Sequence, residues 1–138
     1  RVRERIVARL AVSGVDATFP NVIDPDARLI GAVPEGVGLV AFSGASVSLR
    51  TELGWHVHLN VDAALCHESV VDSYATLAPK AVVCGRAQVG ARSFLGAGSV
   101  VVDDATVPAD AVVGAGAVVL PGLTGPGTYV GVPARRRP

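Results

Sequence analysis

The sequence predicts an all-β fold, a parallel β-helix built from hexapeptide repeats, with a short helix at its amino end. From Ile23 to Val119, every sixth residue is apolar except Glu35. These seventeen six-residue repeats, or hexads, therefore share one phase. Four positions further on, each hexad from Ala63 onward carries a small residue. Period six fits neither a helix nor a plain strand. Three hexads make one triangular coil, which gives about five to six coils, each rising roughly 4.8 Å.

The composition suits such a stack of small side chains. Half of the 138 residues are hydrophobic, only 4% are aromatic, and the formal net charge is zero. A neutral chain has no overall field that attracts nucleic acid or an anionic membrane. The sequence has no apolar run of about 18 residues and no signal-peptide pattern. We therefore expect a cytoplasmic protein without nucleic-acid or membrane partners, whose two cysteines are free thiols.

The two ends depart from the repeat. Residues 1–12, RVRERIVARLAV, carry apolar residues at helical spacing between charges, so we expect a short amphipathic helix. Such a helix has no core of its own, so within residues 1–22 it either caps the coil or belongs to an upstream domain. The β-helix is expected over residues 23–124. Residues 125–138 are expected to form a Gly/Pro-rich exit and a basic tail.

The hexad phase places one histidine where it can do chemistry. We expect the first and fifth residues of a hexad to point inward and the third and fourth to form a corner. His67 is then a corner residue, Glu68 follows it, and Gly85 lies one coil above it. Histidine accepts protons near neutral pH, and a carboxylate beside it orients the imidazole. A glycine amide donates to a developing oxyanion without obstruction by a side chain.

Residues that stack one above the other on successive coils form columns, and two further columns belong to the candidate site. The stacked pairs Ala97-Gly98 and Ala115-Gly116 leave a bare corner along which a long, thin cofactor fits. Glu68 also stacks between two arginines, so a charge ladder across neighbouring coils is an alternative interpretation of that residue.

The stretch LGWHVHLNVDAALCHESVVDSYATLAPKAVVCGRAQVGARSFLGAGSVVV, with the later VVGAGAVVLPGL and VGVPAR, resembles the sugar O- and N-acyltransferases of the sialic-acid O-acetyltransferase type. This family includes acetyl-CoA-dependent N-acetyltransferases of UDP-4-amino sugars, and the resemblance covers about residues 20 to 135. It implies a left-handed coil, a homotrimer with acetyl-CoA bound between subunits, no metal, and direct attack by a sugar-like or other small-molecule acceptor. Full-length members carry an amino-terminal α/β domain, and residues 1–22 look like its last helix and strand.

The resemblance also assigns roles to individual residues. It makes His67 the general base, Glu68 its acidic partner, and Gly85 the amide donor to the thioester carbonyl. Asn60 is implied to lie near the acceptor. Thr76 stands where many members have a second histidine that arranges cofactor and acceptor. The bare column, Ala97-Gly98 and Ala115-Gly116, is implied to line the groove for the pantetheine arm.

Two other functions stay open at this point. A γ-type zinc carbonic anhydrase shares this prism and needs three converging histidines, for which the chain offers His56, His58 and His67. A trimeric scaffold without catalysis is favoured by Thr76 and by the short amino-terminal segment.

Overall fold

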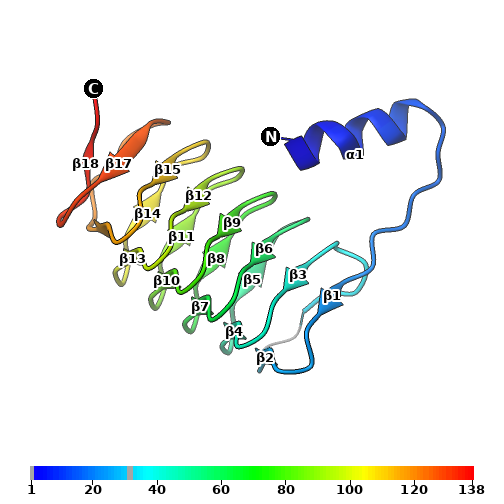
Figure 1. Ribbon diagram of the computed structural model, residues 1–138, viewed down its shortest axis with the longest axis horizontal. Helices are drawn as coiled ribbons and strands as arrows, with labels where there is room; N and C mark the ends of the chain where they lie inside the picture. The colour runs from blue at the N-terminus through cyan, green and yellow to red at the C-terminus, as the bar shows by residue number, and fades with distance from the viewer. Residues whose placement is uncertain (1, 31–32) are drawn as a thin grey trace.

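The computed structural model describes residues 2–30 and 33–138 and is a stack of triangular coils with one helix beside it (Figure 1). This confirms the predicted β-helix with a single short helix. The helix α1 spans Val2–Val12. The strands of the repeat are β1 (Val22–Ile23), β2 (Arg28–Leu29), β3 (Val40–Ala41), β4 (Ser46–Val47), β5 (Glu52–Leu53), β6 (His58–Leu59), β7 (Ala64–Leu65), β8 (Val70–Val71), β9 (Thr76–Leu77), β10 (Val82–Val83), β11 (Gln88–Val89), β12 (Phe94–Leu95), β13 (Val100–Val101), β14 (Thr106–Val107), β15 (Val112–Val113) and β16 (Val118–Val119). Two more strands, β17 (Thr128–Val130) and β18 (Arg135–Arg136), close the carboxyl end.

The strands form three parallel sheets, one on each face of the prism. Face A contains β1-β3-β6-β9-β12-β15, continued by β17 and β18; face B contains β2-β4-β7-β10-β13-β16; and face C contains β5-β8-β11-β14. Each strand pairs with the one a full coil away, as in Leu65 with Val83 and Val83 with Val101. The corners are named here by the faces that they join, in chain order: AB, BC and CA. Residues one coil apart are therefore neighbours in space.

The core fills the inside of the prism with two kinds of side chain. In the hexads from Val47 to Val119 the large first residue and the small fifth residue mostly point inward, as Leu77 and Ala81 do at 0% exposure. Alternation of large and small residues lets successive layers interdigitate at high density. The predicted inward positions are thus confirmed through the middle of the chain.

One predicted hexad does not form a strand. Among the described residues 33–39, between β2 and β3, no strand is present, and Glu35 is exposed rather than inward. The expectation of a strand with an inward first residue is therefore wrong for this hexad, although its fifth residue, Leu39, is buried at 0% exposure as expected. Pro34 lacks the amide donor that a ladder needs, and an unpaired carboxylate is too costly to bury in an apolar core.

The carboxyl end is more ordered than a simple exit. β17 pairs in parallel with β15, and β18 folds back antiparallel onto β17. Tyr129 is 2% exposed and its hydroxyl donates to the carbonyl oxygens of Thr124 and Gly125 at 2.7 and 2.9 Å. The hairpin thus covers the last coil with an aromatic ring, which the Gly/Pro content of residues 125–138 did not indicate.

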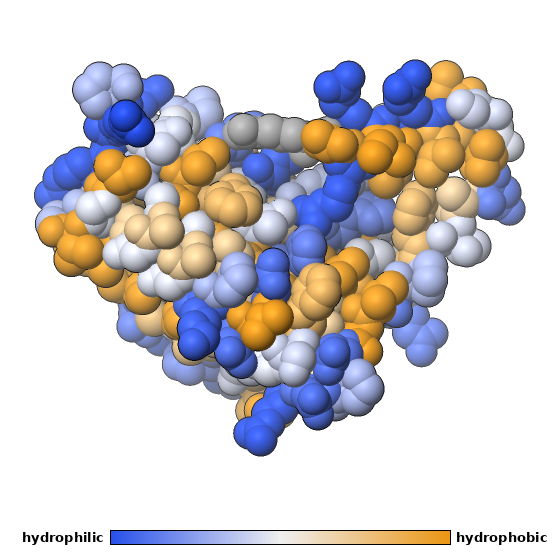
Figure 2. Space-filling model, viewed as in Figure 1, coloured by the Kyte–Doolittle hydropathy of each residue, from blue (hydrophilic) through white to orange (hydrophobic). Residues whose placement is uncertain are grey.

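Among the described residues, the hydrogen bonds and ion pairs from helix α1 to the prism come from its first turn, near the CA corner. Arg3 Nη2 donates to the Thr76 hydroxyl at 2.7 Å, and Glu4 lies 3.4 Å from Arg92. No described residue of the helix is buried, and Val12 is 88% exposed. Apolar surface is accordingly visible along the helix at the upper right of Figure 2. Among the described residues, no helix is long and apolar enough to span a bilayer.

Candidate functional site at the BC corner

The turn between β7 and β8 holds His67 and Glu68 on the outside of the prism. Glu68 has a φ of 58°, the left-handed angle that this place of the hexad adopts at successive corners. Because the backbone turns there, the two neighbouring side chains come together, with His67 Nδ1 3.4 Å from Glu68 Oε2. The His67 side chain is 51% exposed and that of Glu68 is 37% exposed. An imidazole accessible to substrates and a carboxylate that faces one of its nitrogens are thus in place.

The arginines beside this pair are divided between two carboxylates. Arg50 Nη2 lies 2.7 Å from Glu68 Oε1. Arg86 instead binds Asp104 through two contacts of 2.7 and 2.9 Å, which raises the pKa of the Arg86 guanidinium and lowers that of the Asp104 carboxyl. The expected ladder therefore exists only in part. Glu68 keeps its second oxygen for His67.

Gly85 leaves a gap directly against the histidine ring. A Cβ on Gly85 would lie 2.6 Å from His67 Cε1, 2.8 Å from His67 Nε2 and 3.0 Å from Asp103 Oδ1. Gly85 has an ordinary negative φ, which other residues also adopt. Glycine is therefore needed there for the space beside the His67 ring and not for the backbone angle. Among the described residues, the Gly85 amide has no hydrogen-bond acceptor. An imidazole nitrogen and a free amide donor thus meet at one small gap.

For the acyl transfer that the family resemblance implies, we expect Gly85→Ala to lower kcat/KM by about 10²-fold, because the new methyl group displaces the His67 ring. The fold should hold, since the clash is with two exposed side-chain ends. Gly96→Ala is the contrasting variant, because its Cβ would meet the Ala115 amide nitrogen at 2.5 Å. Steady-state kinetics with thermal denaturation will separate a loss of activity for Gly85→Ala from a loss of stability for Gly96→Ala. Unchanged kinetics for Gly85→Ala would contradict this role.

Asp103 is a site residue that the sequence reasoning missed. It stands one coil above Gly85, and its Oδ1 points down into the same gap. The stacking rule that placed Gly85 over His67 places Asp103 over Gly85, so the signal was present. Among the described residues, no cation forms an ion pair with Asp103.

The bare column and Asn60 lie at the AB corner, across face B from His67. Gly98 and Gly116 have φ angles of 65° and 66°, and a Cβ on either would meet nothing within 4 Å. Lys80, at the same corner, has nearly the same φ (59°) with a side chain, so the backbone does not require glycine there. Asn60 Oδ1 accepts from the Val61 amide at 2.8 Å, which leaves its NH2 group as the outward donor. Within one chain these groups are not brought to His67.

Thr76 is on face A, in strand β9, where its hydroxyl accepts from Arg3. Neither this contact nor its sheet joins it to the BC corner within one chain.

The other two histidines pack among aromatic rings. His56, at the CA corner, is 8% exposed, with Phe19 edge-on at 4.7 Å and Tyr74 stacked at 5.1 Å. His58, on face A, stacks on Phe42 at 5.2 Å. Burial, followed by the charge of Arg3, lowers the pKa of both rings and keeps them neutral. The three histidines thus lie on different parts of one chain, and its described residues contain no group of three metal-binding side chains.

Cys66 and Cys84 are free thiols on the outer surface of face B. Burial, then Cys66 and Asp103, raises the pKa of the Cys84 thiol. A thiol held in its protonated form is a poor nucleophile. This favours direct attack on the thioester over a covalent intermediate on Cys84.

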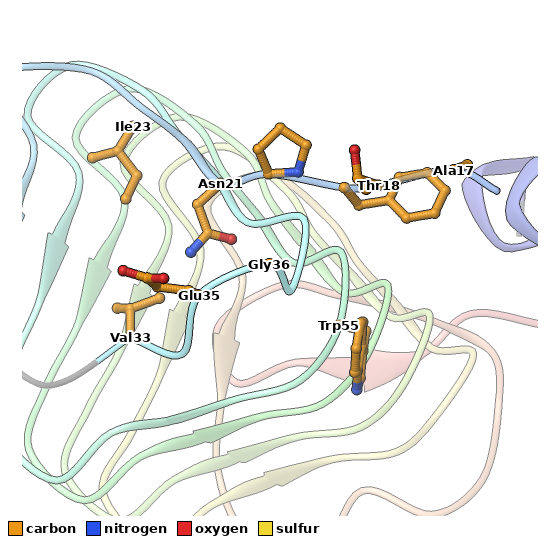
Figure 3. A pocket seen from close by; sticks show the side chains of 10 residues that line it. Ala17, Thr18, Asn21, Ile23, Val33, Glu35, Gly36 and Trp55 are labelled. Atoms are coloured by element: carbon orange, nitrogen blue, oxygen red, sulfur yellow. The ribbon is translucent and has the colours of Figure 1, made fainter.

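A large hollow on the described surface lies away from this corner. It has a volume of about 790 Å³ and lies at the first coils, between the lead-in around Asn21 and the Trp55 ring (Figure 3). None of the candidate site residues from the sequence lines it, although Ile23 and Glu35 of the repeat do. Asn21 is held there by bonds to the Pro34 carbonyl and the Leu39 amide, which tie the lead-in to the coil.

A scan against protein-family models and a search of curated proteins give no match. Solved structures are similar over the whole chain. The acetyltransferase domain of PglB from Neisseria gonorrhoeae FA1090, also solved with acetyl coenzyme A, has a TM-score of 0.91 and 27% identity over 99% of this chain and 66% of its own. A histidine-to-asparagine mutant of perosamine N-acetyltransferase from Caulobacter crescentus was solved with CoA and GDP-perosamine. It has a TM-score of 0.84 and 28% identity, over 100% of this chain and 65% of its own.

WeeI from Acinetobacter baumannii AYE follows with a TM-score of 0.78 and 27% identity, over 99% of this chain and 66% of its own. The chain thus spans about two thirds of the length of these proteins. These neighbours include sugar N-acetyltransferases, in agreement with the resemblance found in the sequence.

Proposed function

We propose that this chain is an acetyl-CoA-dependent acetyltransferase acting on an amine or hydroxyl of a sugar-like acceptor. The observation that carries the proposal is the corner where His67, Glu68 and the free Gly85 amide meet in a fold shared with sugar N-acetyltransferases. One of those neighbours was solved with acetyl coenzyme A and another with CoA and GDP-perosamine. The sequence similarity, at 27–28%, extends over essentially the whole chain.

In this mechanism His67 moves one proton. Its Nδ1 faces Glu68, so its Nε2, the nitrogen nearest the Gly85 gap, is the base. Nε2 takes the proton of the acceptor as the acceptor's nitrogen or oxygen bonds to the thioester carbon. The Gly85 amide donates to the carbonyl oxygen as it becomes negative. The carbon–sulfur bond then breaks, and the proton passes from His67 to the sulfur, releasing coenzyme A as a thiol.

A homotrimer supplies the remaining half of the site in this proposal. Face B lies between the BC corner, with His67, and the AB corner, with Asn60 and the bare column. Its outward residues Ala64, Val82, Val100 and Val118 are apolar and only half-buried in one chain. When three prisms turn the same face toward a threefold axis, the two corners flanking that face meet on neighbouring subunits. Acetyl-CoA then lies between Gly98 of one subunit and His67 of the next.

The proposed setting is the cytoplasm, where acetyl-CoA is supplied and thiols such as Cys66 and Cys84 stay reduced.

A direct assay tests the function. The purified chain is incubated with acetyl-CoA and GDP-perosamine or another amino-sugar nucleotide, and free coenzyme A thiol is measured against time. We expect release that depends on the acceptor and an acetylated product one acetyl group heavier by mass spectrometry. Calorimetry with acetyl-CoA alone checks for the cofactor site. If the trimeric chain neither binds acetyl-CoA nor acetylates any amino sugar or hydroxyl counterpart, the enzyme proposal fails.

A further inference from the structure

We propose that Asp103 selects amine acceptors over hydroxyl acceptors, which makes the chain an N-acetyltransferase. This inference rests on the acetyl transfer proposed above and adds a specificity residue to its site. It starts from the gap over Gly85, which has His67 Nε2 on one side and Asp103 Oδ1 on the other. Neither the general base nor the oxyanion donor requires this carboxylate.

The width of the gap fits a single donor atom. His67 Nε2 and Asp103 Oδ1 lie 2.8 and 3.0 Å from the same point, the place of a Cβ on Gly85. The two atoms are therefore no further apart than those two distances together. The place of the Cβ is one bond length from Gly85 Cα, so an atom of the acceptor must lie further out, beside both groups. That upper limit on the separation is compatible with two bonds of about 2.7–3.2 Å from one donor atom.

An amine and a hydroxyl differ in how many bonds they can donate there. A primary ammonium has three N–H donors, so it can donate to Nε2 and to Oδ1 at once. A hydroxyl has one donor and leaves either the imidazole or the carboxylate unsatisfied. A charged donor on a carboxylate also makes a stronger bond than a neutral one. The gap is thus complementary to a cationic amine.

Among the described residues Asp103 forms no ion pair, although its charge, after that of Asp104, raises the pKa of the Arg86 guanidinium. Arg86, the nearest guanidinium in the adjacent column, is bound by both oxygens of Asp104. Arg50 is bound to Glu68. Asp103 Oδ1 faces the space beside the general base and makes no hydrogen bond to either arginine.

The protons balance in this scheme. The bound ammonium first loses one proton to solvent, and the neutral amine then attacks the thioester carbon while it keeps a donated bond to Asp103. His67 takes the second proton as the carbon–nitrogen bond forms and passes it to the departing sulfur. Asp103 takes up no proton in this scheme, so it is a positioning residue for the acceptor.

The test compares two substitutions that remove the same charge from adjacent residues. Asp103→Asn removes the carboxylate that faces the gap, and Asp104→Asn removes the one that binds Arg86. Each variant and the wild type are titrated by calorimetry, in the presence of coenzyme A, with GDP-perosamine and with the matching nucleotide sugar that has a hydroxyl in place of the amine. Turnover with acetyl-CoA is measured on both acceptors in parallel.

We expect Asp103→Asn to weaken amine binding by about tenfold, with little change for the hydroxyl compound, and to raise KM for the amine more than it lowers kcat. Asp104→Asn should leave the preference between the two acceptors unchanged. Equal preference in wild type and Asp103→Asn overturns the inference, as does a wild type that does not favour the amine. Because binding is measured without turnover, absence of acetyl transfer would count against the proposed function separately.

Discussion

Replacement of His67 with alanine is expected to lower kcat by about 10²- to 10⁴-fold, the usual contribution of a general base. KM for acetyl-CoA should change little, because the AB corner of the neighbouring subunit, and not the His67 side chain, lines the groove proposed for the cofactor. The side chain is 51% exposed, so its removal should leave the thermal unfolding temperature within a few degrees of wild type. Steady-state kinetics and a thermal melt of each protein provide the measurement.

A second histidine gives the control for this experiment. His58→Ala removes an imidazole that stacks on Phe42 on another face of the prism. It should cost stability through lost packing and leave kcat per folded enzyme near the wild-type value. If His67→Ala transfers acetyl groups as fast as His58→Ala does, then His67 is not the base. Glu68→Gln should fall between the two, since it keeps the size of the side chain and removes the charge that faces Nδ1.

The fold could be predicted because one local rule repeats. Every coil needs a large and a small inward residue, and inward positions such as Leu77 and Ala81 follow that rule. The same rule places Gly85 over His67 from the sequence alone, since stacking depends only on the repeat length. It failed at Glu35, where proline and a charge interrupt the pattern, and at the closing hairpin, whose core is a single ring on Tyr129.

Side-chain directions were the part that the repeat could not give. Arg86 is stacked between Glu68 and Asp104, and nothing in its spacing decides which carboxylate it binds. Its choice of Asp104 leaves Glu68 to Arg50 and His67. The direction of the Asp103 side chain, which faces the Gly85 gap, likewise depends on its rotamer and not on the repeat. The repeat therefore predicts the column that a residue occupies, while its partners within and beyond that column depend on three-dimensional packing.

Mixing two inactive variants is expected to restore activity if each site is shared between subunits. His67→Ala removes the proposed base at the BC corner. Gly98→Trp fills the proposed groove at the AB corner, where a Cβ meets nothing within 4 Å and the φ of 65° is close to that of side-chain-bearing residues such as Lys80. Each variant alone should be nearly inactive in the acetyl-transfer assay, although both should fold.

The arithmetic of random assembly makes the outcome quantitative. After the two variants are unfolded together and refolded as a mixture, a given interface has an intact His67 half of the time and an intact groove half of the time. About one quarter of the interfaces in the mixture should then be complete, and activity should recover to about that fraction of wild type. Variants refolded separately and then combined serve as the control and should stay inactive. If His67 instead worked with Gly98 of its own chain, every site would carry one defect and no mixture would regain activity. Recovery therefore requires that face B brings the two corners of neighbouring prisms together, which its apolar, half-buried valines favour.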